Sequence, residues 1–277
     1  MKSFRKLVYP YLLWAIIMIV IPMLMILVYA FTDEGNSVRN FVFSLGSFRR
    51  FFSDTVFLVV LRRSIYIAVL TTVFCVLLGY PMAYAMAKSR FKIHLVLLVT
   101  IPTWINMLVR TYAWRGMLDN NGLINNFLGF FGIAPLKFLE TTFAVVLGMV
   151  YNFIPFMILQ IYTSLEKLDK SLLEAASDLG ANRLQRFLKV TLPLSVPGII
   201  SGITLVFLPA VSSFFIPKLL GGGQYVLIGN VIENQFLTAG DWSFGSAISL
   251  IMAVIIIISM YITRSLDKKT NPEGGDD

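Results

Sequence analysis

The sequence predicts an all-α, polytopic membrane protein with six transmembrane helices. Two observations carry this prediction. Hydrophobic residues make up 57% of the 277 residues and charged residues only 14%, whereas soluble domains carry about 25% charged residues. Six segments are also long and apolar enough to cross a bilayer core of about 30 Å.

The predicted spans divide the chain into a membrane domain, residues 1–265, and a polar cytoplasmic tail, residues 266–277. The spans cover residues 7–31, 64–87, 93–114, 141–165, 195–217 and 243–263. The first is too long for the apolar core of a signal peptide, so we interpret it as a retained anchor. Prolines lie inside the spans at positions 22, 81, 102, 155, 197 and 209. Kinked backbone at membrane depth is tolerated where it is buried or lines a cavity, which suggests a translocation pathway.

The distribution of lysine and arginine predicts that both termini lie in the cytoplasm, because cytoplasmic loops carry an excess of these residues. In that orientation 14 of the 23 basic residues fall in inner segments. They are Lys2, Arg5, Lys6, Lys88, Arg90, Lys92, Lys167, Lys170, Arg183, Arg186, Lys189, Arg264, Lys268 and Lys269. Because the basic residues flank apolar segments, lipid headgroups explain the net charge of +8 and we predict no nucleic-acid partner.

One predicted outer loop, residues 39–63, conflicts with the charge rule. It holds Arg39, Arg49, Arg50, Arg62 and Arg63. Its aromatic-basic segment, residues 48–52, suits either the outer headgroups or a docking surface for an external partner. We favour the headgroups, and both roles are compatible.

Residues for cofactor or catalytic chemistry are scarce. Cys75 is the only cysteine and His94 the only histidine, so an intrachain disulfide and a histidine–cysteine metal site lack their residues. The sequence has no Gly-x-x-x-x-Gly-Lys-Ser/Thr loop for nucleotide phosphates, and no lysine follows Gly221–Gly223. We therefore predict no catalytic residue, no metal and no cofactor bound by this chain.

The longest charge-rich run, residues 166–193, lies between the fourth and fifth predicted spans. Over residues 165–179 the apolar positions recur at helical spacing, with the charged residues mostly off that stripe. Gly180 suits the left-handed position that ends a helix. Asn182 suits the N-cap of a second helix over 183–190, before prolines mark the return to the membrane. An ordinary interfacial helix is the alternative interpretation.

The spacing within this run resembles the EAA loop of ABC-importer permeases. Glu174, Ala175 and Ala176 are followed after three residues by Gly180, and nine residues later by Val-Thr-Leu-Pro at 190–193. Valine stands at 190 where isoleucine is usual in that family. Residues 102–110, 164–181, 227–232 and 241–245 further resemble the spermidine/putrescine (PotB-type) permease subunits. The chain is thus similar, over nearly its whole length, to ABC-importer permeases of the binding-protein-dependent (MetI-like) family.

The resemblance implies a six-helix permease core with a cytoplasmic coupling helix, in a bacterial inner membrane. A homologous second permease (PotC-like) would form the other half of the pathway. Two copies of a cytoplasmic ATPase (PotA-like) would bind ATP and Mg, and an extracytoplasmic binding protein (PotD-like) would deliver polyamine, so this chain would not itself be an enzyme. The residues that the resemblance assigns to coupling with the ATPase are Glu174, Ala175, Ala176, Asp178, Gly180, Leu192 and Pro193.

A polyamine is an extended polycation, and aromatic faces and carboxylates are the groups that replace its hydration. The candidate pathway residues are Trp104, Asn106, Tyr112, Phe214, Phe215, Glu233, Asp241 and Trp242. Asp241 and Trp242 form the strongest pair, because an acid and an indole are adjacent. Packing or an interfacial belt is the alternative for each ring. Arg110 and Arg115 argue against a simple cation funnel near the third span.

Three other functions stay open at this point. An importer permease for sulfate, molybdate or ferric iron is the first, although the spans hold almost no basic residue for an anion. A secondary transporter is the second, although it would use intramembrane carboxylates or inverted repeats, which the sequence lacks. A membrane enzyme is the third, and it would need a nucleophile–base pair or metal ligands.

Overall fold

The computed structural model describes residues 2–32 and 42–270, with side chains for 9–32 and 42–265. Within these ranges the chain is helical, apart from turns and an isolated antiparallel bridge between Thr32 and Phe43. The predicted all-α class is confirmed. Residues 271–277 of the predicted tail and the start of the loop 39–63 lie outside the described residues, and the last helix runs to Thr270.

Among the described residues, five helical stretches are long and apolar enough to cross a membrane. They are Tyr9–Ala30, Thr55–Lys88, Thr142–Glu166, Arg183–Ser212 and Trp242–Ser265. A bent pair, Lys92–Trp104 with Met107–Phe130, meets the same test as one unit but turns by 90° at its break. The segment predicted as a third span, 93–114, therefore differs from a simple spanning helix.

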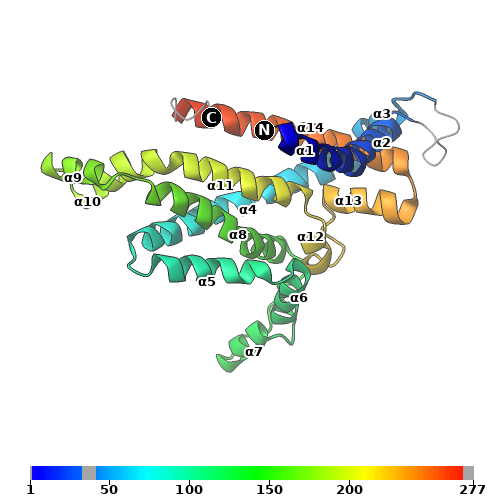
Figure 1. Cartoon of the computed structure of the whole chain (residues 1–277). Helices are drawn as coiled ribbons and strands as arrows, with labels where there is room; N and C mark the ends of the chain where they lie inside the picture. The colour runs from blue at the N-terminus through cyan, green and yellow to red at the C-terminus, as the bar shows by residue number, and fades with distance from the viewer. Residues whose placement is uncertain (1, 33–41, 271–277) are drawn as a thin grey trace. The chain divides into compact units, whose positions relative to one another are not determined.

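The chain divides into two compact units. The first comprises Met1–Leu61 with Ile228–Ile257, and the second comprises Arg62–Leu227 with Ile258–Asp277. The long helices α4 (Thr55–Lys88) and α14 (Trp242–Thr270) each contribute to both units (Figure 1).

The first unit is built from the chain's N-terminal part and the start of its last helix. Its further elements are α1 (Lys2–Ala15), the π-helical turn η1 (Ile16–Val20), α2 (Ile21–Ala30), α3 (Gly46–Ser53), α13 (Ile228–Asn234) and the π-helical turn η3 (Gln235–Ala239). The wide turn η1 directly precedes Ile21 and Pro22. A proline ring clashes with the carbonyl four residues earlier, and a π-turn is a known site where a helix absorbs such a change.

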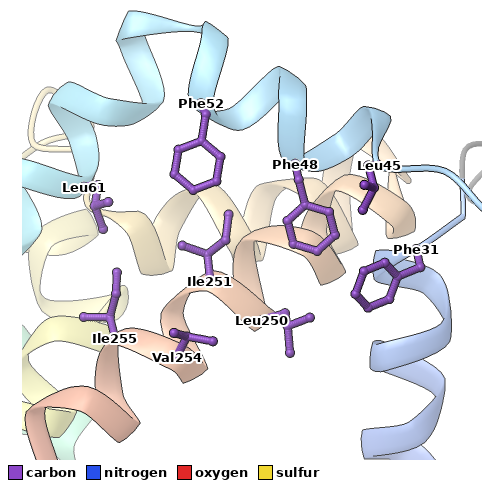
Figure 2. Close-up of a pocket in the computed structure, with 9 residues that line it drawn as sticks. All are labelled: Phe31, Leu45, Phe48, Phe52, Leu61, Leu250, Ile251, Val254 and Ile255. Carbon is purple, nitrogen blue, oxygen red and sulfur yellow. The ribbon is translucent and has the colours of Figure 1, made fainter.

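An apolar pocket of about 450 Å³ lies inside this first unit, below α3 (Figure 2). Phe48 and Phe52 point from α3 toward Leu250 and Ile251 on α14. The lining comprises Phe31, Leu45, Phe48, Phe52, Leu61, Leu250, Ile251, Val254 and Ile255. The amphipathic helix α3 thus lines the pocket with two aromatic rings, although Phe52 is exposed at its edge. Phe51 of α3 is buried and stacks near Phe57, with ring centroids 6.0 Å apart.

The second unit holds the remaining helices. They are α5 (Lys92–Trp104), α6 (Met107–Leu118), α7 (Leu123–Phe130), α8 (Thr142–Glu166), α9 (Lys170–Asp178), α10 (Arg183–Arg186), the π-helical turn η2 (Phe187–Thr191), α11 (Leu192–Ser212) and α12 (Phe215–Leu220). Helices α8 and α11 run side by side and form the core of this unit (Figure 1). Helix α5 packs on the same helix α8.

Small residues let α8 and α11 approach closely. A Cβ placed on Gly198 would lie 2.4 Å from the Ser164 Cβ and 2.8 Å from the Gln160 carbonyl oxygen. A Cβ on Gly202 would lie 2.5 Å from the Met157 sulfur. Close packing of this kind, rather than a hydrophobic driving force, holds helices together in lipid.

Contacts at the two ends of this unit join loops that the sequence predicts on the same side of the membrane. At one end, Lys92 Nζ lies 3.5 Å from the Glu166 carboxylate, so two predicted inner segments meet. At the other end, the Thr142 and Tyr225 hydroxyls are 2.7 Å apart, and the Arg63 guanidinium lies 5.5 Å from the Tyr225 ring centroid. Which end faces the cytoplasm stays a prediction from the charge distribution.

Candidate functional site

The loop predicted to couple to an ATPase begins with a capped helix. Helix α8 ends at Glu166, and after a short turn the Asp169 carboxylate accepts a hydrogen bond from the Ser171 N–H at 2.9 Å. This bond lowers the pKa of Asp169 below its ordinary value, because it favours the ionised carboxylate. The sequence predicted helix continuously from residue 165, so Asp169 was missed as the N-cap of α9. An aspartate three positions before Leu172 was the available signal.

The sharp turn predicted at Gly180 is present. Gly180 has φ +83°, the Ala181 N–H donates to the Ala176 carbonyl at 3.0 Å, and the Gly180 N–H donates to the Ser177 carbonyl at 2.9 Å. This pair of bonds is the Schellman arrangement, in which a left-handed residue satisfies the last helical carbonyls. No atom outside the immediate backbone lies within 4 Å of a Cβ placed on Gly180. Backbone conformation, rather than space, therefore requires glycine here.

The second helix of the loop starts at a capping box. Asn182 accepts from the Gln185 N–H and the Gln185 side chain accepts from the Asn182 N–H, each at 2.9 Å. The predicted N-cap at Asn182 is confirmed, and its partner Gln185 is the residue that the sequence reasoning left out.

The second helix of the loop was predicted over 183–190, and its separation from the following span is wrong. Helix α10 passes through η2 directly into α11, so residues Arg183–Ser212 form one helical stretch. Pro193 lies in the first turn of α11, just after the wide turn η2, as Pro22 follows η1. The second helix of the loop is therefore the end of a core helix, and displacement of the loop acts directly on α11.

The side chains of the loop are largely uncovered. Neither α9 nor α10 has a buried residue. Leu179 is 88% exposed, and Leu172 and Leu184 are exposed as well. Glu174, Ala175, Asp178 and Gly180 are exposed, Ala176 is half-buried, and further along Leu192 is half-buried and Pro193 exposed. An apolar surface rimmed by charges that the fold itself leaves open is typical of a protein-binding site.

Aromatic contacts join this loop to the end of α4. The Phe187 ring packs edge-on against Tyr80 and Tyr84, with centroid distances of 5.8 and 5.3 Å. The Tyr80 and Ser195 hydroxyls are 2.9 Å apart, and Arg186 donates to the Ser177 hydroxyl at 2.6 Å. The loop is thus held to α4, and α4 in turn to α11, by contacts for which the sequence pattern gave no signal.

Five of the candidate pathway residues lie in the second unit, four of them at two helix breaks and Tyr112 within α6. Trp104 ends α5 and is 74% exposed, while the Asn106 side chain caps α6 by accepting from the Leu108 N–H at 2.8 Å. Phe214 and Phe215 follow the end of α11. The Tyr112 ring on α6 lies edge-on to Phe215, with centroids 6.4 Å apart, so the two breaks are brought together. Broken helices with polar caps are typical of transport sites.

Arg110 stands beside this pair of breaks with an unusual environment. Its Nε and Nη1 atoms are buried and have no hydrogen-bond partner among the described residues. Buried polar atoms of a charged group are costly without a partner, and the residue as a whole is half-buried on α6.

The other three candidates, Glu233, Asp241 and Trp242, lie in the first unit. The Asp241 carboxylate pairs with Arg50 at 2.9 Å and also accepts from the Phe244 N–H at 3.0 Å. The Trp242 ring lies edge-on to Tyr29 and Phe236, with centroids 6.0 and 5.9 Å apart. Arg50, which the sequence placed in a conflicting outer loop, therefore neutralises the acid that was the favoured cation ligand. A direct role of Asp241 in binding stays a prediction.

The described residues contain no group of three or more His, Cys, Asp or Glu side chains arranged to hold a metal ion. The arrangement consists of a loop whose side chains are largely uncovered and of aromatic rings near two helix breaks.

Comparisons with known proteins agree with this geometry. The family described as "Binding-protein-dependent transport system inner membrane component" matches residues 75–272. The chain is 40% identical over 269 residues to the spermidine/putrescine transport system permease protein PotB of Escherichia coli (strain K12), covering 94% of this chain and 98% of that protein. PotB of Haemophilus influenzae is 40% identical over 263 residues, covering 93% and 92%.

Solved structures share the fold. A bacterial ABC transporter involved in the import of the acidic polysaccharide alginate aligns with a TM-score of 0.82 at 17% identity, covering 97% of this chain and 96% of that one. An inward-facing MetNI methionine ABC transporter aligns with a TM-score of 0.58 at 13% identity, covering 77% and 95%. These matches confirm the resemblance to MetI-like permeases and to PotB-type subunits that the sequence motifs indicated.

Proposed function

Since the chain belongs to the family of binding-protein-dependent transport system inner membrane components, we propose that it is the permease subunit of an ATP-driven polyamine importer. The similarity to PotB over nearly the whole chain supports the substrate class. The exposed, locally capped loop α9–α10 is the observation that carries the coupling role, because it presents a protein-binding surface that is continuous with a core helix.

The proposed partners follow from this role. A second, homologous permease (PotC-like) supplies the other half of the pathway. Two ATPase subunits (PotA-like) bind ATP and Mg below the membrane, and a polyamine-binding protein (PotD-like) docks outside. Both termini of this chain lie in the cytoplasm in the proposed orientation. Arg110, with its unpaired buried nitrogens, suits a contact with the second permease.

The proposed mechanism is a bistable membrane core that the ATPase biases through the loop. Closure of the ATPase pair moves α9, and the capping box at Asn182 transmits this motion into α10 and α11 without a flexible joint. Phe187 carries the same motion to Tyr80 and Tyr84 on α4. In this mechanism Glu174 meets polar groups of the ATPase and Ala175 and Ala176 permit close seating.

The proposed pathway uses aromatic faces more than carboxylates. Trp104, Tyr112 and Phe215 surround two helix breaks, where ring faces and backbone carbonyls replace the hydration of ammonium groups. Asp241 is available to a polyamine only by exchange, in which a substrate ammonium displaces Arg50. That ion pair is partly exposed on both sides, so the exchange costs little.

The test is the ATPase activity of the assembled transporter in liposomes, with and without binding protein and spermidine. We expect stimulation only when both are present. Stimulation by sulfate or another solute in place of spermidine would keep the permease role and overturn the substrate. Failure of the chain to co-purify with any ATPase would overturn the coupling role itself.

A further inference from the structure

A second cavity, distinct from the proposed polyamine pathway, lies at the base of the coupling loop. It has a volume of about 260 Å³ and is lined by residues that include Lys88, Arg183, Arg186, Tyr84, Leu173 and Phe187. These residues come from the end of α4, from α9, and from the α10–η2 segment. We call this cavity the basic pocket. It brings three cationic side chains together, and no carboxylate is among its lining residues.

The positive charge of the basic pocket is not balanced within the described part of the chain. The ion pairs found there are Arg50–Asp241, Lys92–Glu166 and Lys137–Glu140, and none involves a pocket residue. Lys88 contacts only neutral groups, since its ammonium bonds the Tyr84 hydroxyl and lies 4.1 Å from the Tyr84 ring centroid. Like charges gathered at one site repel one another unless an anion joins them.

Arg186 is the residue of the basic pocket whose polar atoms are not all satisfied. Its Nη1 donates to the Ser177 hydroxyl at 2.6 Å, which fixes the orientation of the guanidinium. Its Nε is buried and has no hydrogen-bond partner. A buried, oriented N–H without an acceptor is costly, and an anionic oxygen is the acceptor that a guanidinium binds best.

We propose that the basic pocket binds a phosphate group, and that its source is the headgroup of an anionic phospholipid. Guanidinium groups match the geometry of phosphate oxygens, and Lys88 adds a point charge. Lys88 is the last residue of α4, so the pocket lies where that helix reaches the predicted cytoplasmic headgroups, and basic pockets between membrane helices bind such headgroups. Leu173 and Phe187 supply apolar walls for the adjoining glycerol and acyl ester groups.

A bound headgroup would bridge α4, α9 and α10 and stiffen the coupling loop. This consequence rests on the proposed function, because it assumes that the loop transmits motion from the ATPase. Anionic lipid would then raise the coupling of transport to ATP hydrolysis, while binding of the lipid itself depends on the pocket alone.

The experiment counts the phosphatidylglycerol molecules retained by the assembled transporter after delipidation, by native mass spectrometry. The test variant is Arg183→Gln/Arg186→Gln. The matched control is Lys170→Gln/Lys189→Gln, which removes the same charge from exposed positions of the same loop that do not line the pocket. We expect the wild type and the control to retain one lipid more than the test variant, with affinity weakened at least about tenfold in the latter.

Further arms separate the source of the phosphate and guard against a folding defect. Inorganic phosphate, radiolabelled, is tested on the lipid-free complex. Binding as tight as that of phosphatidylglycerol, and absent from the test variant, would assign the site to free phosphate and overturn the lipid source. If the double variant fails to co-purify with the ATPase, Lys88→Gln replaces it as the test variant, because it is a single change at an exposed residue. Arg186→Lys keeps the positive charge but removes the planar set of guanidinium N–H donors, so we expect partial retention of the lipid.

Equal lipid and phosphate binding by wild type, test variant and Lys88→Gln would overturn the proposal. The polyamine-stimulated ATPase activity of the wild type, measured on the same samples, reports on the proposed function separately.

Discussion

The α8–α11 core and the α9–α10 loop adjoin in the chain but are stabilised in opposite ways. In the core, α8 has many buried residues and its glycine-lined contacts with α11 leave no room for one added carbon. In the loop, no side chain of α9 or α10 is buried, and the conformation is fixed by the caps at Asp169, Gly180 and Asn182. The loop is therefore fixed in shape by local backbone hydrogen bonds and not by packing, as the proposed coupling role requires.

The largest expected effect comes from adding one carbon to the core. Gly198→Ala places a methyl 2.8 Å from the backbone oxygen of Gln160, which has no freedom to move, so we expect a loss of about 1–3 kcal/mol or failure to insert. Gly202→Ala meets the mobile end of Met157 and should cost less. Gly129→Ala on α7 meets nothing within 4 Å and is the control. Thermal unfolding of the purified complex should rank the variants in this order, and equal stabilities would contradict the close packing.

In the loop, the expected effect is on coupling and hardly on stability. Gly180→Leu places an ordinary side chain at φ +83° in open space, at a local cost of about 1–2 kcal/mol. We expect the protein to insert and assemble but to lose transport-coupled ATPase activity, because the angle between α9 and α10 changes. Gly180→Asn is the control, since asparagine tolerates this conformation. Normal coupling in Gly180→Leu would show that the turn has no role in transmission.

The smallest expected effect is the pH dependence of the cap at Asp169. The pKa of the Asp169 carboxyl is lower in the folded state than in the unfolded state, where it is about 3.9. The cap is therefore fully stabilising above the unfolded-state pKa, and this stabilisation is lost as pH falls through the folded-state pKa. We expect amide exchange at Ser171, relative to an Asp169→Asn variant whose cap does not titrate, to be constant from about pH 5 to 8 and to rise below about pH 4. A transition near neutral pH would contradict this assignment.

The same contrast explains what the sequence could predict. The turn at Gly180 and the cap at Asn182 depend on neighbouring residues, so their spacing was enough to locate them. The continuity of α10 with α11 was missed because Pro193 reads as a break, whereas the wide turn η2 accommodates it. The pairing of Arg50 with Asp241 joins residues 191 positions apart, and no local pattern encodes such a contact.

The candidate pathway shows the same limit. Trp104 and Tyr112 were chosen as aromatic residues on or near the third predicted span, and Phe215 as one near the outer end of the fifth. The structure places Trp104 and Phe215 at two helix breaks and Tyr112 within α6. The contact between Tyr112 and Phe215 depends on how α6 packs against α12. Periodicity within either helix gives no information about that packing, so the residues were predictable as a class but not as a site.

The most direct test of the coupling role is cysteine cross-linking in the assembled transporter, on a Cys75→Ala background. Leu179 and Phe130 are 88% and 87% exposed and lie in segments predicted to face opposite sides of the membrane. We predict that Leu179→Cys cross-links to the ATPase and that Phe130→Cys does not. Cross-linking of the ATPase to position 130 would contradict the proposed orientation. Cross-linking to neither position in an assembled and active complex would contradict the role of the loop.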